Sequence, residues 1–289
     1  MSTGTFMKTI GTVIVIISVF SLLTNKEDSS TKLKIQQQEQ DKPLKIQRCL
    51  RTLPIGVPKS GGNGMVQICR SAYITNYDLE AKIPVWVAYT LTPEHALGCL
   101  ARGEFFTEDL SIQEMNRSTR DDYKNSGFDM GHMANAADMA WDSHILKESF
   151  YLSNMSPQWP KFNRGVWKTL ECAVRASVYY KAHSHSIYVG SIYDNSSKRI
   201  GKNEVVVPNA IFKIIVDLIR DEYLAFVIPN REEDLNSDFN VYQTSLTDIE
   251  NMAGLKLPDK LLKMQEMKST LPDSKLVEEF HQVKKTHCM

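Results

Sequence analysis

Asp129, Met130, Gly131 and His132 form a short segment whose residue types could do chemistry. A neutral imidazole near pH 7 can take a proton from water, provided that a partner holds the ring in one orientation. Gly131 would let the backbone turn tightly beside that ring. Because a single histidine before a helix more often has a structural role, the catalytic interpretation of His132 depends on the residues that accompany it.

An asparagine and a glutamate follow at a spacing that suits metal-assisted hydrolysis of a phosphodiester. Asn163 stands at the start of a predicted helix, where its ordinary role is to cap the first turn. Glu171 follows roughly two turns later and lies near the same helix face. Amide and carboxylate oxygens are ligands that Mg²⁺ accepts, and such a reaction needs a cation on the phosphate and the leaving oxygen.

Arg175 stands one turn after Glu171 and allows two interpretations. The spacing suits a salt bridge between the two side chains on the helix surface. A guanidinium group also suits a charge-assisted contact with phosphate. The spacing by itself favours neither.

The segments around these residues predict an α+β domain. Runs rich in β-branched and aromatic residues predict strands at 70–77, 84–91, 186–193, 205–216 and 223–229. Helices are predicted at 134–140, 147–150, 164–183 and 246–253. Because strands and helices are interspersed without strict alternation, we expect a central, mainly antiparallel sheet flanked by helices.

Composition places the chain among ordinary globular proteins and restricts how it could bind an anionic partner. Of 289 residues, 42% are hydrophobic and 24% are charged, which excludes bulk disorder and a multi-span membrane protein. The 34 basic and 34 acidic residues give a formal net charge of zero. Any phosphate-binding surface must therefore be local.

The chain ends differ from the middle. Lys8 precedes an apolar run at 10–23, so residues 1–24 are predicted to be a signal peptide or an N-terminal membrane anchor. A polar linker is predicted at 25–46, the folded catalytic domain at 47–262, and a charged tail, helical or frayed, at 263–289. The domain would then lie outside the cytosol: secreted, periplasmic or membrane-anchored, or in the mitochondrial intermembrane space if the source is eukaryotic.

Five cysteines are present and none forms a Cys-x-x-Cys pair, which argues against a zinc ribbon. In an exported chain one or two disulfides are expected, and Cys49 with Cys69 is the pairing we favour because the two flank one loop. The alternative is that the cysteines are small buried apolar residues.

Several ordered blocks together resemble the DNA/RNA non-specific endonucleases of the ββα-metal, or His-Me finger, class, whose members include endonuclease G-like enzymes. That family has an Asp-Arg-Gly-His motif, a Thr/Ser-Asn segment and an Asn-x-x-x-Trp-x-x-x-Glu helix, and the resemblance covers roughly residues 66–260. The matching residues are Asp129, Gly131, His132, Ser153, Asn154, Asn163, Trp167, Glu171 and Arg175.

The resemblance implies a metal-dependent hydrolysis of DNA and RNA with little sequence preference. His132 would be the general base that activates water, Asn163 would be the direct ligand of one Mg²⁺, and Glu171 would hold metal-bound water. Mn²⁺ would be a substitute metal. Recognition of the phosphate backbone rather than base edges would explain the weak sequence preference.

The resemblance also implies supporting roles. Asn154 would position His132 or the cluster of metal-bound waters, and Arg102 and Arg175 would contact phosphate and stabilise the transition state. Members of the family are often homodimers, so a homodimer is expected here. Contact with a membrane would occur only through an uncleaved N-terminal segment.

Met130 departs from the family pattern, which has arginine at this position. Methionine supplies neither charge nor a strong hydrogen bond, and a lost charge-assisted contact could lower the rate on the order of 10²–10³. Lys124 or Arg164 could compensate. Two alternatives remain: a nucleic-acid-binding module with weakened catalysis, and a phosphodiesterase of narrower specificity.

Overall fold

The computed structural model describes residues 53–61, 64–103, 106–268 and 270–289. The predicted leader or anchor at 1–24 and linker at 25–46 lie outside the described residues, as does Cys49 of the predicted Cys49–Cys69 pairing. None of the helices in the described part of the chain has the length and apolarity needed to cross a bilayer.

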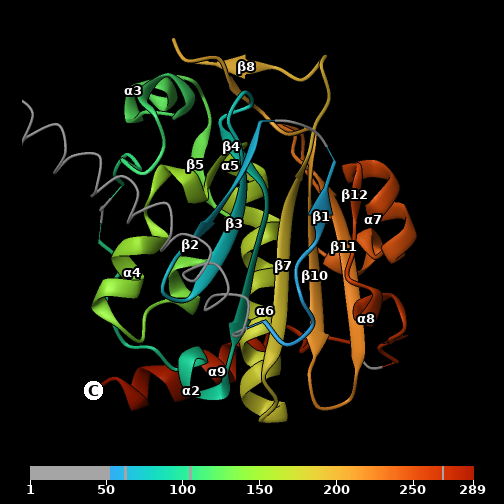
Figure 1. Ribbon diagram of the computed structural model, residues 1–289. Helices are drawn as coiled ribbons and strands as arrows, with labels where there is room; N and C mark the ends of the chain where they lie inside the picture. The colour runs from blue at the N-terminus through green and yellow to red at the C-terminus, as the bar shows by residue number, and fades with distance from the viewer. Residues whose placement is uncertain (1–52, 62–63, 104–105, 269) are drawn as a thin grey trace, which may run out of the picture. The chain divides into compact units, whose positions relative to one another are not determined.

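A seven-stranded sheet forms the centre of the fold (Figure 1). In spatial order its strands are β13 (Gln265–Glu266), β11 (Glu222–Pro229), β10 (Ala210–Asp217), β7 (His185–Ile192), β4 (Ile83–Leu91), β3 (Tyr73–Asp78) and β2 (Met65–Cys69). All neighbours are antiparallel except β11 and β13. The predicted α+β class with a mainly antiparallel sheet is confirmed.

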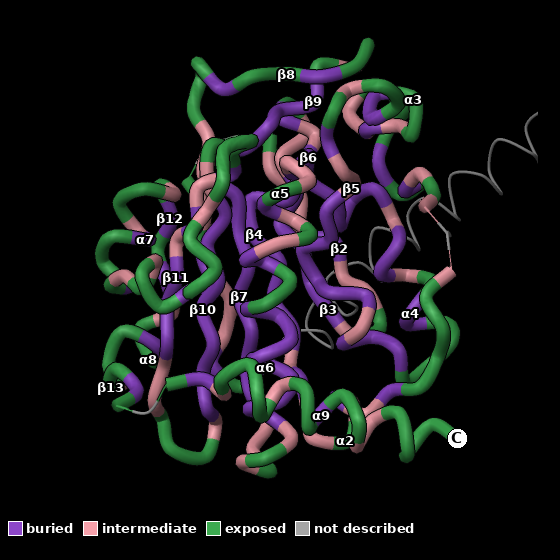
Figure 2. Tube along the Cα trace, turned by 180° about the vertical axis from the view of Figure 1, so that it is seen from behind, coloured by how far each residue is buried: buried purple, intermediate pink, exposed green. Residues whose placement is uncertain are grey.

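Alternation of side chains along the central strands gives the sheet two buried faces. On β4, Val87 and Tyr89 face one core, whereas Trp86 and Ala88 face the other. The first core lies beneath helix α6 (Lys168–Lys181), and the second beneath α7 (Leu246–Ala253) and α8 (Asp259–Leu262). The central strands are therefore buried along most of their length (Figure 2).

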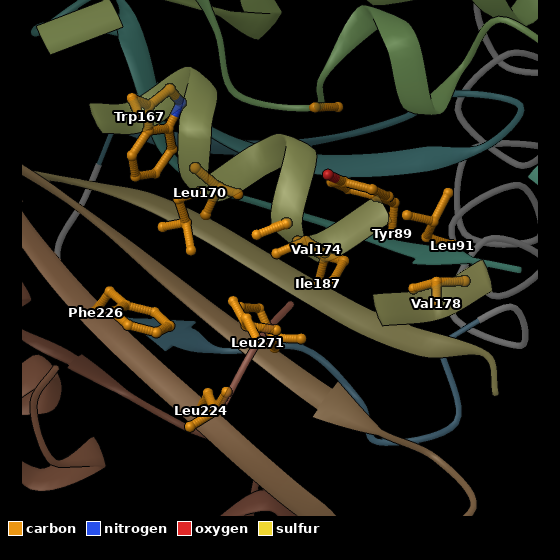
Figure 3. Close-up of a cluster of buried hydrophobic side chains, with 14 of the residues drawn as sticks. Tyr89, Leu91, Trp167, Leu170, Val174, Val178, Ile187, Leu224, Phe226 and Leu271 are labelled. Carbon is orange, nitrogen blue, oxygen red and sulfur yellow. The ribbon is translucent and has the colours of Figure 1, made fainter. Parts of the chain in front are cut away.

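Helix α6 packs on the sheet because its apolar residues recur at helical spacing. Leu170, Val174 and Val178 are buried and form one stripe toward the strands, as Figure 3 shows. The helix ends at Ala182, which adopts a left-handed conformation. This packing fixes the helix from which Glu171 and Arg175 project.

A ββα unit stands on the α6 side of the sheet. Strand β5 (Asp129–His132) pairs antiparallel with β6 (Met155–Gln158), and His132 lies opposite Met155. The chain then continues through α5 (Pro160–Phe162) and the π-helical segment η4 (Asn163–Trp167) into α6. Gly165, with ψ −118°, breaks the helical conformation between the two helices.

Short elements connect these layers. They are β1 (Lys59–Ser60), α2 (Pro93–Ala96), η1 (Glu114–Asn116), α3 (Arg120–Tyr123), η2 (Ala136–Asp138), α4 (Ser143–Ser149), η3 (Leu152–Asn154), β8 (Arg199–Ile200), β9 (Val205–Val206), η5 (Phe239–Tyr242) and β12 (Leu255–Lys256). The helix predicted at 134–140 is only the single 3-10 turn η2. The strand predicted at 205–216 is divided into β9 and β10, because Pro208 has no N–H for a sheet ladder.

The segment predicted as a tail is an ordered helix, α9 (Ser274–His287), and belongs to the same compact unit as the sheet. Phe280 is fully buried, with its ring 5.5 Å from that of Tyr179 on α6. A disulfide joins Cys288, just past the helix end, to Cys99 near α2. Cys172 is a free, buried thiol.

Candidate active site

His132, at the end of β5, is buried between aromatic rings. The Phe150 ring meets it edge-on at 4.7 Å, and Phe106 lies 5.6 Å away. Burial, together with the positive charge of Arg102, lowers the pKa of His132 to about 3. The ring is therefore neutral near pH 7. Its Nε2 atom has no hydrogen-bond partner among the described residues, which leaves it available to a water or a substrate.

Gly131 makes room for a buried neighbour of the histidine. A Cβ at this position would lie 1.9 Å from the side-chain carbon Cδ of Gln158 on β6. Because Gln158 is fully buried, it has little freedom to move aside. The glycine predicted to permit a tight turn therefore has a different role here, which is to admit the Gln158 side chain against β5.

Asp129 holds the start of the π-helical segment. Its carboxylate accepts a hydrogen bond from Nδ2 of Asn163 at 2.9 Å, and bonds from Nε and Nη2 of Arg164 at 2.8 and 2.5 Å. A carboxylate can only accept, so this contact fixes the nitrogen of the Asn163 amide toward Asp129. The side-chain oxygen Oδ1 of Asn163 therefore lies on the side of the amide group that faces away from Asp129.

Glu171 lies in the first turn of α6 and is largely buried. Its Oε1 is 3.6 Å from Nζ of Lys213, which projects from β10 and stands 4.5 Å from the centre of the Trp167 ring. Burial lowers the pKa of Lys213, and the Glu171 carboxylate opposes that effect. Sequence reasoning missed Lys213. The available signal was a lysine between Ile211 and Ile215 on the same face of a mostly apolar strand.

Arg175 has a carboxylate partner that its spacing from Glu171 did not reveal. Its Nη1 donates to Asp138 at 2.8 Å, and the Tyr89 hydroxyl donates to the other oxygen of Asp138 at 2.7 Å. The guanidinium is thus held by η2 and β4 while it also lines the cavity that contains Glu171. The i,i+4 salt bridge with Glu171 that the spacing allowed is replaced by this longer-range pair.

Asn154 lies entirely inside the protein and acts on the backbone. Its Oδ1 accepts from the Ala134 N–H at 2.8 Å, and its Nδ2 donates to the carbonyls of Ala134 and Ser149. The backbone carbonyl of Asn154 also accepts from the Met133 N–H. These bonds fix the chain that leaves His132, which suits a positioning residue.

Two neighbouring cavities, which share several lining residues, adjoin these side chains. The large cavity, of about 1090 Å³, is lined by Met130, Asn163, Glu171 and Arg175. The side cavity, of about 410 Å³, is lined by His132. Arg102, Asn163 and Glu171 line both. The structure therefore brings together every predicted site residue except Asn154, which supports the site from behind.

The large cavity supplies the local positive charge that the balanced composition required. Its described lining has six cations against three carboxylates: Arg102, Arg120, Lys124, Arg164, Lys168 and Arg175 against Asp121, Asp129 and Glu171. Two nitrogens of the Arg164 guanidinium already donate to the Asp129 carboxylate. A polyanion would be attracted to this surface even though the whole chain is neutral.

The donor set at the cavity suits a hard cation that keeps most of its water. Within the described residues no cluster of three or more His, Cys, Asp or Glu side chains could hold a metal ion. The Asn163 oxygen and the Glu171 carboxylate line the same cavity. One amide oxygen and one carboxylate, with water at the other positions, fit Mg²⁺ better than zinc.

Comparisons with known proteins point to one family. A family model for the DNA/RNA non-specific endonucleases matches residues 54–264. Endonuclease G, mitochondrial, from Homo sapiens is 32% identical over 233 residues, which cover 75% of this chain and 78% of the human protein. Nuclease C1 from Cunninghamella echinulata var. echinulata is 32% identical over 208 residues, covering 66% of this chain and 82% of that protein.

A solved structure supports the same assignment. A chain in the crystal structure of the EndoG/EndoGI complex, which concerns the mechanism of EndoG inhibition, aligns with a TM-score of 0.63 and 30% sequence identity. The alignment covers 75% of this chain and 92% of that chain. The ββα unit and the cationic cavity are consistent with these matches. This chain belongs to the DNA/RNA non-specific endonuclease family.

Proposed function

We propose that the chain is a Mg²⁺-dependent endonuclease that hydrolyses phosphodiester bonds in DNA and RNA with little sequence preference. The observation that carries this proposal is a neutral, unpartnered His132 Nε2 beside a cavity lined by Asn163 and Glu171. A site that only bound nucleic acid would need the surrounding cations. It would not need a buried neutral imidazole next to two oxygen ligands.

In this proposal His132 accepts a proton from the attacking water. The ring stays neutral because it is buried, but a base with such a low pKa is weak. A phosphate bound nearby adds negative charge and raises the pKa of the ring toward a useful range. Asn154 positions the ring through the backbone that follows it. General-base catalysis of this kind contributes about 10²–10⁴ in rate.

Asn163 would hold the metal directly through Oδ1, and Glu171 would hold its water ligands. When bound, Mg²⁺ (or Mn²⁺ in its place) would neutralise charge on the phosphate and on the leaving oxygen. Asp129 keeps the amide oriented by accepting from Nδ2. Lys213 limits the mobility of the Glu171 carboxylate by pairing with it. Arg102 and Arg175 would contact the phosphate oxygens from the cavity wall.

Lys124 is the cation that we propose compensates for Met130. Met130 packs against the apolar cluster that contains Tyr123, and the adjacent Lys124 lines the same cavity. Arg164, the other candidate, is held by Asp129. Lys124→Gln is expected to lower cleavage on the order of 10², and adding Met130→Arg should restore most of it. An unchanged rate for Lys124→Gln would refute the compensation.

Digestion of plasmid DNA and of RNA, with Mg²⁺ and with EDTA, tests the main proposal. Cleavage of both substrates that EDTA abolishes is expected. His132→Ala should lower the rate by about 10²–10⁴ while the near-ultraviolet circular dichroism stays that of the folded protein. Tight binding of DNA without Mg²⁺-dependent cutting would instead favour the weakened binding module, and cutting of one nucleic-acid type only would favour the narrower phosphodiesterase.

We further propose that the enzyme works outside the reducing cytosol. The Cys99–Cys288 disulfide supports an oxidising compartment. Relatives from human, worm and yeast are named as mitochondrial proteins, which favours a mitochondrial location among the candidates, the others being secretion, the periplasm and a membrane anchor. N-terminal sequencing of the mature protein separates cleavage from anchoring, and light scattering tests the expected homodimer.

A further inference from the structure

The C-terminal helix forms one wall of the side cavity. Lys284 and Lys285 of α9 line this cavity together with His132, Asn163 and Glu171. The matched family region ends at residue 264, ten residues before α9 begins at Ser274. This wall is therefore formed by a part of the chain outside that region, directly beside the proposed catalytic base.

Two anchors fix the position of Lys284. Phe280, one helical turn earlier, is fully buried against α6, and Cys288, one turn later, is bonded to Cys99. Residues four apart lie on the same helix face, so Lys284 is on the face that is held against the body of the protein. Its Nζ is 3.5 Å from the Ala96 carbonyl, a long contact, and the other donors of the ammonium group have no hydrogen-bond partner in the described part of the chain.

The charged side chains that line this cavity favour the binding of an anion. Arg102, Lys284 and Lys285 line it, and Glu171 is the one carboxylate in its described lining. Within the described residues neither lysine is paired with a carboxylate. Burial and the nearby Arg175 lower the pKa of Lys284, and the negative charge of a bound anion would oppose the repulsion from Arg175.

We propose that Lys284 and Lys285 bind a backbone phosphate of the nucleic acid that neighbours the one being cleaved, so that α9 is a wall of the substrate groove. The inference rests on the proposed function. The strand would pass from the large cavity, across Asn163 and Glu171, into the side cavity, because both cavities share these residues. The two lysines would add affinity and would take no part in the bond-breaking step.

Equilibrium binding of a fluorescent single-stranded oligonucleotide, in EDTA and at several salt concentrations, tests this without any cleavage. The double variant Lys284→Gln/Lys285→Gln should bind about tenfold more weakly at low salt, the effect of one lost charge-assisted bond. The slope of log K against log salt should become shallower by about 0.7, because one phosphate contact is lost. Lys275→Gln is the matched control, since Lys275 is exposed on α9 and lines neither cavity.

A second measurement compares substrate lengths in the presence of Mg²⁺. The double variant should raise KM for long oligonucleotides and leave kcat unchanged, and the difference should disappear for a dinucleotide, which carries no neighbouring phosphate. An unchanged salt slope, or an equal loss for Lys275→Gln, would overturn the inference. If neither the wild type nor the double variant cleaves any substrate, the proposed function fails. The binding result still decides the role of α9. Matching thermal unfolding of wild type and variants confirms that α9 remains folded.

Discussion

The two faces of the central sheet are built from the same strands but differ in what they bury. On β10, Phe212, Ile214 and Val216 point to the core beneath α7 and α8. Lys213 and Asp217 alternate with them and lie on the α6 side, where Lys213 meets Glu171 and Asp217 meets His183. His185 on β7 lies on this second face too, by the same alternation. One face is apolar, and the other carries charge.

The difference shows how this fold separates stability from chemistry. A buried charge costs more free energy than a buried methylene unless it is paired. The α6 face accordingly pairs its charges: Arg175 with Asp138, and Lys213 with Glu171. These pairs add little net stability by comparison with an apolar core, but they hold the cavity-lining groups in place. The opposite face supports the sheet without contributing to the site.

Removing one member of a pair on the charged face should have the largest effect on folding. Asp138→Asn leaves Arg175 buried without a carboxylate and is expected to cost about 3–5 kcal/mol of unfolding free energy. Ile214→Val, on the apolar face of β10, is the control and should cost about 0.5–1.5 kcal/mol with no change in kcat. Urea denaturation and cleavage assays measure both. A cost below about 1 kcal/mol for Asp138→Asn would mean that the two faces do not differ in this way.

Acid should destabilise the protein through the buried histidines of the charged face. Burial lowers the pKa of His185 to about 4, below the value of about 6.5 in an unfolded chain. The unfolded state therefore binds more protons between these values. The contribution of His185 to the free energy of unfolding is therefore complete above pH 6.5. It falls as the pH drops from 6.5 toward 4, by up to about 1.4 kcal/mol for each pH unit.

Urea denaturation at pH 7, 6 and 5 measures this slope. His185→Gln should flatten it, whereas His287→Gln should leave it unchanged because His287 is exposed on α9. His132, with a pKa of about 3, contributes in the same direction and accounts for part of the slope that remains. Equal slopes for wild type and His185→Gln would show that this histidine is not desolvated in the native state.

Local patterns were enough to predict most of the sheet and the helix that supports the site. The strand predicted at 84–91 corresponds to β4, and the helix predicted at 164–183 contains α6, because β-branched residues and helical periodicity are local signals. The helix predicted at 147–150 begins earlier, at Ser143, because Asp142 caps it through two backbone N–H groups. Hydrophobic periodicity indicates the apolar face of a helix, but it does not indicate where such a cap begins the helix.

What the sequence did not reveal depends on contacts between distant segments. The spacing left Arg175 open between a salt bridge with Glu171 and a contact with phosphate, and it gave no sign of Asp138, the carboxylate that η2 brings to Arg175. The disulfide joins cysteines 189 residues apart, and no spacing rule connects Cys99 with Cys288. The position of α9 follows from these long-range contacts. For that reason its segment looked like a charged tail.

The Cys99–Cys288 bond has a consequence for the lifetime of the protein among proteases. It closes the chain covalently around β5, β6 and α6, together with four of the seven sheet strands. A single proteolytic cut in any exposed loop between the two cysteines leaves both fragments linked to each other. A nicked molecule would therefore migrate as one species until it is reduced, and the residues of the proposed active site would stay on one covalent assembly.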